Sequence, residues 1–440
     1  MSETLSENQQ IALDNFILGN NVFLTGPGGS GKTYLIKEIV KRCKENLLNV
    51  QVCALTGCAA VLLECQAKTI HSWAGIGLAN GEPIDVVKRV CKSKYKRAPW
   101  KNVDVLIIDE VSMMSKKLFD ILNKIPQVIR KNTQPFGGIQ VVFSGDFYQL
   151  PPVGDEEDPD SCSFCFESVD WKKTFQTTVV LDRIFRQNDS KYVKALNEIR
   201  MGRIKKSSYD LLCSRLNKTC DDEIRPTILL PLKRHVEHIN ATELAKINEE
   251  EKVFNTQNYC DEEIMEKEKK KYARMSVTQD SLEMELSYLK NNIMADQLLK
   301  LKKGALVMCV ANIDMESEQQ IVNGSQGIVV DFENGFPIVK FRNGAVKTMG
   351  NHVWMSEKIP WMGVKQIPLI LAWAITIHKA QGVTLDVAQI DAGRHIFECG
   401  QTYVALSRIK NIDGLYLSAF DFKKIKVNKK VKTFYEKLVV

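Results

Sequence analysis

The sequence has no run of about 18 uninterrupted apolar residues, so it predicts no membrane-spanning helix. Its first ten residues, MSETLSENQQ, are polar and acidic. They resemble neither a secretion signal, which needs an apolar core, nor an arginine-rich transit peptide. We therefore expect a soluble, intracellular protein.

Paired cysteine motifs are also scarce. The 12 cysteines are scattered without a disulfide framework, as is usual in a reducing compartment. Cys162 and Cys165 have the CxxC spacing of zinc ligands, but a zinc site would need a second pair, and no matching CxxC occurs. We expect two thiols in a loop here and no metal site.

No composition bias marks the chain as fibrous or disordered. Hydrophobic residues make up 44% and charged residues 26%, as in ordinary globular proteins. A length of 440 residues is enough for two or three domains. The formal net charge of +7, from 60 basic and 53 acidic residues, is compatible with a polyanionic partner without requiring one.

The stretch from Asn21 to Thr33, NVFLTGPGGSGKT, contains the motif GxxxxGK[ST]. The apolar run Val22–Leu24 predicts a buried strand before the loop, and the residues after Lys32 have helical spacing. Glycines let backbone N–H groups converge on a phosphate, and the helix N-terminus adds partial positive charge. The motif therefore predicts a nucleotide site whose residues are Gly26, Gly28, Gly29, Ser30, Gly31, Lys32 and Thr33.

Two carboxylates follow a second buried run. Val103–Ile108 predicts a central parallel strand, and Asp109 and Glu110 come directly after it. In this position Asp109 can hold magnesium, and Glu110 can orient and deprotonate the attacking water.

Two glutamines are candidates for contacts to the nucleotide. Gln149 follows the predicted strand Ile139–Phe143, where a neutral amide suits a sensor of the γ-phosphate. Gln9 has two readings: it completes the capping box Ser6-Glu7-Asn8-Gln9, or its amide pairs with adenine. The residues around Gln9 leave both open.

Three further segments are candidates for contacts to nucleic acid. Thr56 follows the predicted strand Val50–Leu55, at the sheet edge where α/β proteins bind ligands. The segment Thr69–Trp73, TIHSW, could hold a sugar-phosphate backbone and stack a base, or could contain a core tryptophan and a buried histidine. The basic run Lys88–Lys101, with interleaved aromatics, is either a solvated surface or a nucleic-acid contact.

Taken in order, these motifs resemble those of the superfamily-one DNA helicases of the PIF (petite integration frequency) type, relatives of RecD and phage Dda. The resemblance extends from Leu5 to about Leu417, and its most specific part is PFGGIQVVFSGDFYQLPPV, Pro135–Val153, preceded by the helix KKLFDILNKIPQVIRK. It implies that Gln9 reads adenine. It also implies that Thr56, Thr69, His71 and Trp73 grip single-stranded DNA.

The second half of the chain matches the same family. In Leu181–Gln187, LDRIFRQ, the resemblance implies that Arg186 faces the γ-phosphate, and in Gly400–Arg408 it implies a second arginine finger, Arg408. In AITIHKAQG it implies that Thr376, His378 and Lys379 donate to DNA phosphates. The same segment places Gly382 near the nucleotide.

The family fold implied is α/β, with two tandem RecA-like P-loop NTPase domains and ATP in the cleft between them. We expect a first motor domain over residues 1–160, with a small basic arm near 76–101. The second would cover 161–300 and 367–440, with an inserted Src-homology-like β-barrel over 301–366. The charged segment 249–300 is expected to be a solvated helix or mobile connection without a mechanistic role.

The activity implied by the resemblance is ATP- and Mg²⁺-dependent unwinding of DNA, with 5′ to 3′ movement on a single strand. The catalytic residues would be Lys32, Glu110, Gln149, Arg186 and Arg408. We expect a monomeric motor acting on single-stranded and forked DNA in replication, repair or recombination, without a long extension before Gln9. An ATP-gated clamp or remodeller and an RNA helicase are the alternatives, and the host and compartment (nucleus, cytoplasm or a viral replication site) stay open.

Overall fold

The computed structural model describes residues 5–63, 65, 67–77, 79, 81–220, 222, 224–266, 279–314, 317, 319–356, 359 and 361–438. The chain forms two compact units. The first unit contains Met1–Ser214, Ala392–Ile412 and Phe420–Val440, and the second contains Arg215–Asp391 and Asp413–Ala419.

A six-stranded parallel sheet forms the centre of the first unit, in the strand order β3-β2-β4-β5-β1-β6. Its strands are β1 Val22–Thr25, β2 Val50–Ala54, β3 Lys68–Thr69, β4 Val105–Asp109, β5 Gln140–Gly145 and β6 Thr177–Val180. β6 pairs with β1, so this sheet extends past the predicted domain boundary at residue 160.

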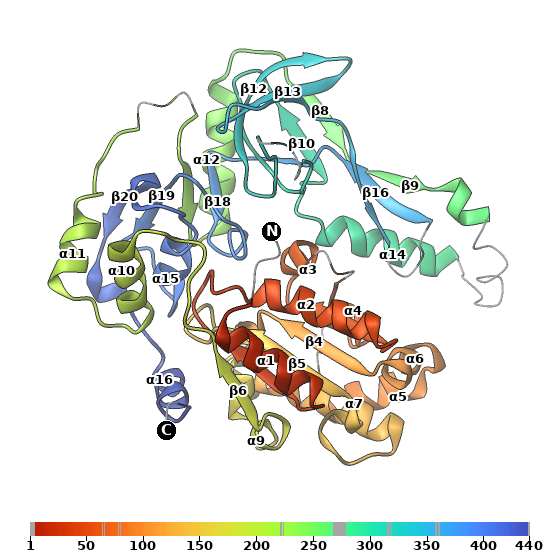
Figure 1. Ribbon diagram of the computed structural model, residues 1–440. Coiled ribbons are helices and arrows are strands. Elements are labelled where there is room, and N and C mark those ends of the chain that lie inside the picture. Colours follow the sequence, from red (N-terminus) through yellow and green to blue (C-terminus); the bar gives the residue numbers. More distant parts are fainter. Residues whose placement is uncertain are drawn as a thin grey trace. The chain divides into compact units, whose positions relative to one another are not determined.

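Helices cover both faces of this sheet (Figure 1). The helices of the first unit are α1 Glu7–Ile17, α2 Lys32–Glu45, α3 Gly57–Leu63, α4 Ile70–Trp73, α5 Pro83–Lys92, α6 Lys94–Asn102, α7 Lys116–Arg130, α8 Pro159–Cys162, α9 Trp171–Thr174, α10 Ser190–Arg200, α11 Lys206–Cys213, α15 Gln401–Leu406 and α16 Lys429–Glu436.

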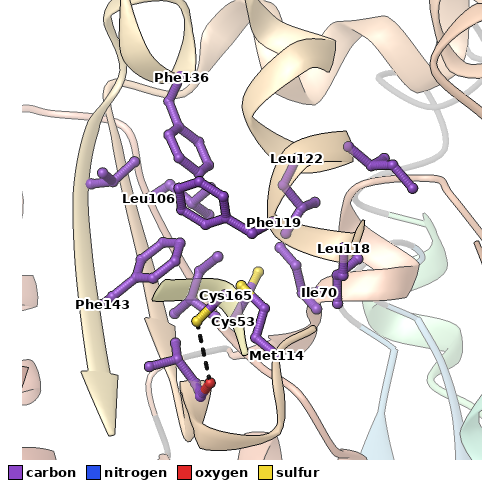
Figure 2. Close-up of a cluster of buried hydrophobic side chains, with 14 of the residues drawn as sticks. Cys53, Ile70, Leu106, Met114, Leu118, Phe119, Leu122, Phe136, Phe143 and Cys165 are labelled. Carbon is purple, nitrogen blue, oxygen red and sulfur yellow. Dashed lines mark hydrogen bonds between the residues drawn. The ribbon is translucent and has the colours of Figure 1, made fainter. Parts of the chain in front are cut away.

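Alternate residues of each strand enter two different cores. In β1, Val22 and Leu24 pack with α1 and α2, whereas Phe23 packs on the opposite face. Figure 2 shows this second core, where Phe119 of α7 points toward Leu106 and Phe143 of the sheet, and Leu118 and Leu122 of the same helix belong to the cluster. Because both faces of the central strands are buried, β1, β4 and β5 are mostly apolar runs, which is why the sequence predicted them.

The second unit contains a smaller sheet in the order β18-β7-β19-β20, in which β7 pairs in parallel with β18 and β19. The strands are β7 Thr227–Leu230, β18 Ala374–Thr376, β19 Ala388–Ala392 and β20 Leu415–Phe420. Helix α12, Lys233–Lys246, follows β7.

The remaining strands of the second unit make three antiparallel sheets, of orders β14-β13-β12-β11-β17, β15-β16-β9 and β10-β8. Helix α14 is Gln279–Asn292. The strands are β8 Lys252–Asn255, β9 Gln257–Cys260, β10 Leu298–Leu301, β11 Leu306–Cys309, β12 Gln326–Glu333, β13 Phe336–Phe341, β14 Val346–Thr348, β15 His352–Met355, β16 Met362–Gln366 and β17 Leu369–Leu371.

One local prediction for this unit was confirmed in part, and two were wrong. The apolar residues of 321–330 predict a strand and Asn323-Gly324 predicts a turn; the turn forms, and the strand begins only after it, at Gln326. Leu369–Leu371, assigned to the motor core, pairs with β11 of the five-stranded sheet. The charged segment 249–300 includes β8 and β9, which pair with β10 and β16, so it is not only solvated helix or mobile connection.

Two other expectations for this unit stay predictions. The five-stranded sheet supplies the strands expected for the inserted domain, but its closure into a barrel is not established by the pairing order. Residues 267–278 of the charged segment lie outside the described residues. Across the described part of the chain, no helix is both long and apolar enough to span a bilayer.

Candidate functional site

The phosphate loop has the predicted strand–loop–helix form. β1 ends at Thr25, and α2 begins at Lys32. The buried Lys32 ammonium donates to the carbonyl oxygens of Gly26 (2.8 Å) and Pro27 (3.0 Å), so it lies inside the curve of the loop. Burial lowers the pKa of Lys32, while the nearby acids Asp146, Glu110 and Asp109 act in the opposite direction.

The acidic pair, Asp109 and Glu110, lies at the end of β4, which is separated from β1 by one strand of the same sheet. Asp109 is the last residue of β4, and Glu110 follows with a left-handed φ of 55° that turns the chain sharply at the sheet edge. Burial, and then the charge of Glu110, raise the pKa of Asp109 to about 6. Two neighbouring carboxylates with little solvent are stabilised by a cation.

Both predicted arginines lie against the phosphate loop. A Cβ atom on Gly28 would be 3.3 Å from Nη2 of Arg408, and one on Gly29 would be 2.5 Å from Cβ of Arg186. The close approach of Arg186 to Gly29 leaves room for glycine alone at that position. The structure therefore brings the loop and both arginines together within the first unit.

The arginines are held in place by the last turn of α15 and by Ser407, which follows this helix. Arg186 donates to the carbonyl oxygen of Ser407 (3.1 Å), and the Arg408 side chain donates to the carbonyl oxygen of Val404 (2.9 Å) and to the Ser407 hydroxyl (2.8 Å). Gln187 also donates to the carbonyl oxygen of Ser407 (3.1 Å). These bonds pre-arrange the guanidinium groups.

The site carries buried positive charge. Burial, and then repulsion from Arg408, lower the pKa of Arg186. Burial lowers the pKa of Arg408 too, while Glu110 opposes this shift. Lys32 and Arg408 are buried and Arg186 is half-buried, and all three cations lie against the loop. Buried charges need partners of opposite sign, and a polyphosphate supplies them.

Gln9 makes the predicted cap and also contacts the loop. Its Oε1 accepts from the Ser6 N–H (2.9 Å), which completes the capping box of α1, and its Nε2 donates to the carbonyl oxygen of Gly31 (3.3 Å). The cap is therefore confirmed, and the adenine contact stays a prediction.

Sequence reasoning missed two aromatic residues at the loop. The ring of Phe185, 47% exposed, lies beside Gly31, and the Arg183 guanidinium is 5.0 Å from its centroid. The hydroxyl of Tyr403 accepts from the N–H of Gly28 (2.8 Å). Phe185 stood next to Arg186 in the sequence, which was an available signal, whereas nothing local pointed to Tyr403.

Gln149 is buried four residues after β5. Its Oε1 atom has no hydrogen-bond partner among the described residues. A buried amide oxygen without a partner is costly, so it marks a group that is satisfied by something else in the working protein. This fits the predicted sensor role without testing it.

The DNA-contact candidates of the first unit lie near one sheet edge. Thr56 follows β2, where its hydroxyl accepts from the Ala59 N–H (3.2 Å), and Thr69 ends the adjacent parallel strand β3. His71 is half-buried, and burial lowers its pKa. Trp73 is only 7% exposed, and its ring centroid lies 4.5 Å from that of Trp100 in the core. The structure thus favours the core reading of Trp73, and the DNA roles of the others stay predictions.

The basic arm expected near 76–101 forms α5 and α6, with Trp100 buried and Tyr95 exposed. Its exposed cations are Lys88, Arg89, Lys92, Lys94, Arg97 and Lys101.

The candidates of the second unit lie at the end of β18 and in the turn that follows it. The hydroxyl of Thr376 accepts from the Lys379 N–H (3.0 Å), and the Lys379 ammonium is 3.6 Å from Asp296. Burial lowers the pKa of His378. Gly382 has a left-handed φ of 81° in the same segment, and its nucleotide contact stays a prediction.

Cys162 and Cys165 differ in environment. Cys162 is exposed, whereas Cys165 is buried, and its thiol lies 3.8 Å from the carbonyl oxygen of Val111 (Figure 2). Burial raises the pKa of Cys165 well above its ordinary value. Such a thiol resists ionisation, so it is a poor metal ligand.

The parallel sheet, phosphate loop, acidic pair and two arginines define a P-loop nucleotide-binding protein. Comparison with known families then gives a match to the PIF1-like helicase model over residues 4–209 and to the model of the DNA helicase Pif1 2B domain over residues 286–332.

Among curated proteins, the ATP-dependent DNA helicase PIF1 of Emericella nidulans is 34% identical over 96% of this chain and 61% of its own length. The human protein of the same name is 33% identical over 99% of this chain and 64% of its own length. The chain therefore spans less than two thirds of these curated relatives.

Among solved structures, Pif1 helicase from Candida albicans matches with a TM-score of 0.75 and 33% sequence identity. The match covers 99% of this chain and 99% of that one. Pif1 from Bacteroides sp. in complex with ADP-AlF4 has a TM-score of 0.78 and 30% identity, over 100% of this chain and 98% of that one. The chain belongs to the PIF1-like helicase family. This confirms the predicted resemblance and the fold class of tandem RecA-like domains.

Proposed function

We propose that this protein is an ATP-driven helicase that moves 5′ to 3′ on single-stranded DNA and separates duplex DNA. The observation that carries the proposal is the placement of Arg186 and Arg408 against Gly29 and Gly28 of the phosphate loop. Curated relatives bear the name ATP-dependent DNA helicase PIF1, and a similar solved structure is that of Bacteroides Pif1 bound to ssDNA.

In the proposed reaction, a water molecule attacks the γ-phosphorus of ATP in line with the bond to the β–γ bridging oxygen. That bond breaks, and ADP and phosphate leave. Glu110 orients the water and accepts its proton, while Lys32, Arg186 and Arg408 stabilise the charge that develops on the phosphoryl oxygens. Gln149 senses the γ-phosphate, and its unpartnered Oε1 is available for this.

Thr33 and Asp109 fit a magnesium ion. Magnesium takes oxygen ligands, and the buried carboxylate of Asp109 next to the half-buried Glu110 favours a cation, as the raised pKa of Asp109 indicates. When bound, the ion would neutralise charge on the β- and γ-phosphate oxygens.

The base of the nucleotide would lie at the other end of the loop. Gln9 contacts Gly31 there, and the exposed ring of Phe185 lies on the same glycine. An amide pairs with the edge of adenine and an aromatic ring stacks on its face. We propose both contacts.

The DNA strand would be held by its backbone through Thr56, Thr69, His71, Thr376, His378 and Lys379, with little reading of bases. Closure of the nucleotide site would move the strand by one step. The protein would act as a monomeric intracellular motor in replication, repair or recombination. One similar structure describes two coordinating Pif1 helicases at forked DNA.

Affinity for single-stranded DNA should fall steeply with salt, because binding of cations to phosphates releases counterions. The slope of log K against log salt is about −0.7 for each phosphate contacted. Lys379→Ala should flatten this slope by about one such unit. Lys172→Ala, which removes an exposed cation next to the start of α9, is the matched control and should leave the slope unchanged. A salt-independent affinity of the unaltered protein would contradict backbone binding.

Strand displacement on matched DNA and RNA forks tests the proposed function. With ATP, we expect unwinding of DNA forks that carry a 5′ single-stranded tail and little with only a 3′ tail. Closure on DNA without strand separation would favour the clamp, and equal or better unwinding of RNA would favour an RNA helicase. Better activity on 3′ tails would contradict the direction.

A further inference from the structure

The last helix of the chain contacts the nucleotide site through one hydroxyl group. The hydroxyl of Tyr435, in α16, lies 2.6 Å from the Thr25 hydroxyl, 3.2 Å from the Phe147 backbone nitrogen and 3.4 Å from Oδ1 of Asp146. A phenol has one proton and can accept two hydrogen bonds. All three contacts are satisfied if Tyr435 donates to Asp146 and accepts from Thr25 and Phe147.

The acceptor of this network is a fully buried carboxylate. Asp146 has no exposed surface and receives two hydrogen bonds of 2.8 Å from the Arg200 guanidinium of α10. Although burial disfavours the charge on Arg200, Asp146 raises its pKa above the ordinary value. A buried bidentate pair has one geometry, so it fixes the position of the groups bonded to it.

The residues that Tyr435 joins lead directly into the catalytic segments. Thr25 is the residue before Gly26, where the phosphate loop begins. Asp146 and Phe147 lie three and two residues before Gln149 in the segment after β5. The hydroxyl therefore ties the start of the phosphate loop to the segment that carries Gln149.

The packing of α16 does not depend on this hydroxyl. Phe434 stacks on Phe166 with a centroid distance of 4.3 Å and an interplanar angle of 21°. The Tyr435 ring stacks on Tyr148 at 4.6 Å and 16°. Phenylalanine at position 435 would keep these ring contacts. The hydrogen bonds of the Tyr435 hydroxyl are therefore not needed to hold α16 in place, and they require another explanation.

We propose that Tyr435 is a positioning residue for ATP hydrolysis, which holds the phosphate loop and the Gln149 segment in register with each other. This inference rests on the proposed function. It assigns the C-terminal helix α16 a role in the nucleotide site of the first unit, although Tyr435 lies 410 positions after Thr25 in the sequence.

Tyr435→Phe tests the proposal, with Tyr148→Phe as its matched control. The hydroxyl of Tyr148 belongs to the same aromatic stack but finds no hydrogen-bond partner within the described part of the chain. We expect kcat of DNA-stimulated ATP hydrolysis to fall about tenfold in Tyr435→Phe, because small misplacements of catalytic groups are costly. KM for ATP should change less than about threefold, since the loop still binds the phosphates. Tyr148→Phe should stay within about twofold of the wild type in both constants.

Three results would overturn the inference: wild-type kcat in Tyr435→Phe, a lowered melting temperature with unchanged kcat for each folded molecule, or an equal loss in Tyr148→Phe. In each of these cases, normal ATP hydrolysis by the wild type in the same experiment would leave the proposed function intact. A wild type without hydrolysis would contradict the proposed function first.

A double-mutant cycle with Thr25→Val provides the second measurement. Valine keeps the shape of Thr25 without its hydroxyl. If the two side chains act through one bond, the double variant should lose no more kcat than the more affected single variant. Independent, multiplying losses would contradict the link between Tyr435 and the loop, even if Tyr435→Phe folds poorly by itself.

Discussion

Replacing Arg408 by alanine is expected to lower DNA-stimulated ATP turnover by about a thousandfold, as for the loss of an arginine finger. Arg408 lies against the phosphate loop, since its Nη2 atom would be 3.3 Å from a Cβ atom on Gly28. The terminal phosphate is expected at this part of the loop. ATP binding should weaken only modestly, because the loop and Lys32 remain. DNA binding should persist, because the DNA-contact candidates are untouched.

Two further variants separate catalysis from folding. Arg408→Lys should restore little activity, since an ammonium cannot copy the planar guanidinium that donates to Val404 and Ser407. Arg394→Ala removes an exposed arginine before α15 and should keep full turnover. Arg408 is buried, so melting temperatures must be measured with single-turnover hydrolysis. A normal hydrolysis rate for each folded Arg408→Ala molecule would remove this residue from the site.

Lys32→Ala is expected to abolish ATP hydrolysis while single-stranded DNA binding is retained. The Lys32 ammonium lies inside the loop, where it donates to Gly26 and Pro27, and it is the group that the motif predicts to reach the β- and γ-phosphates. Lys41→Ala, an exposed position of the same helix, is the control and should hydrolyse ATP normally. Turnover by Lys32→Ala, measured in a preparation free of the wild type, would show that the loop was wrongly assigned.

The parts of the site that lie within one sequence motif could be predicted from the sequence. Gly26–Thr33 and the pair Asp109 and Glu110 each follow an apolar strand, and strand, loop and helix formed as expected. Their proximity follows from parallel strands ending at one sheet edge. The positions of Arg186 and Arg408 came only from family resemblance, since no local pattern predicts that residues so far apart in the chain meet at Gly28 and Gly29.

The missed features depend on contacts between distant segments. Tyr403 and Tyr435 were overlooked because their partners, Gly28 and Thr25, are hundreds of residues away. The strands β8 and β9 lie in a charged segment, and their pairing with β10 and β16 outweighs their composition. Leu369–Leu371 was recognised as apolar, but only its pairing with β11 shows which sheet it joins.

Steady-state ATP hydrolysis with and without single-stranded DNA tests the central claim most directly. With Mg²⁺ present, we expect turnover that single-stranded DNA raises by about tenfold or more, because the proposed motor would couple closure of the site to the bound strand. Glu110→Gln should remove this activity while both ATP and DNA still bind. An absence of hydrolysis under these conditions, or a rate that single-stranded DNA does not change, would contradict the account.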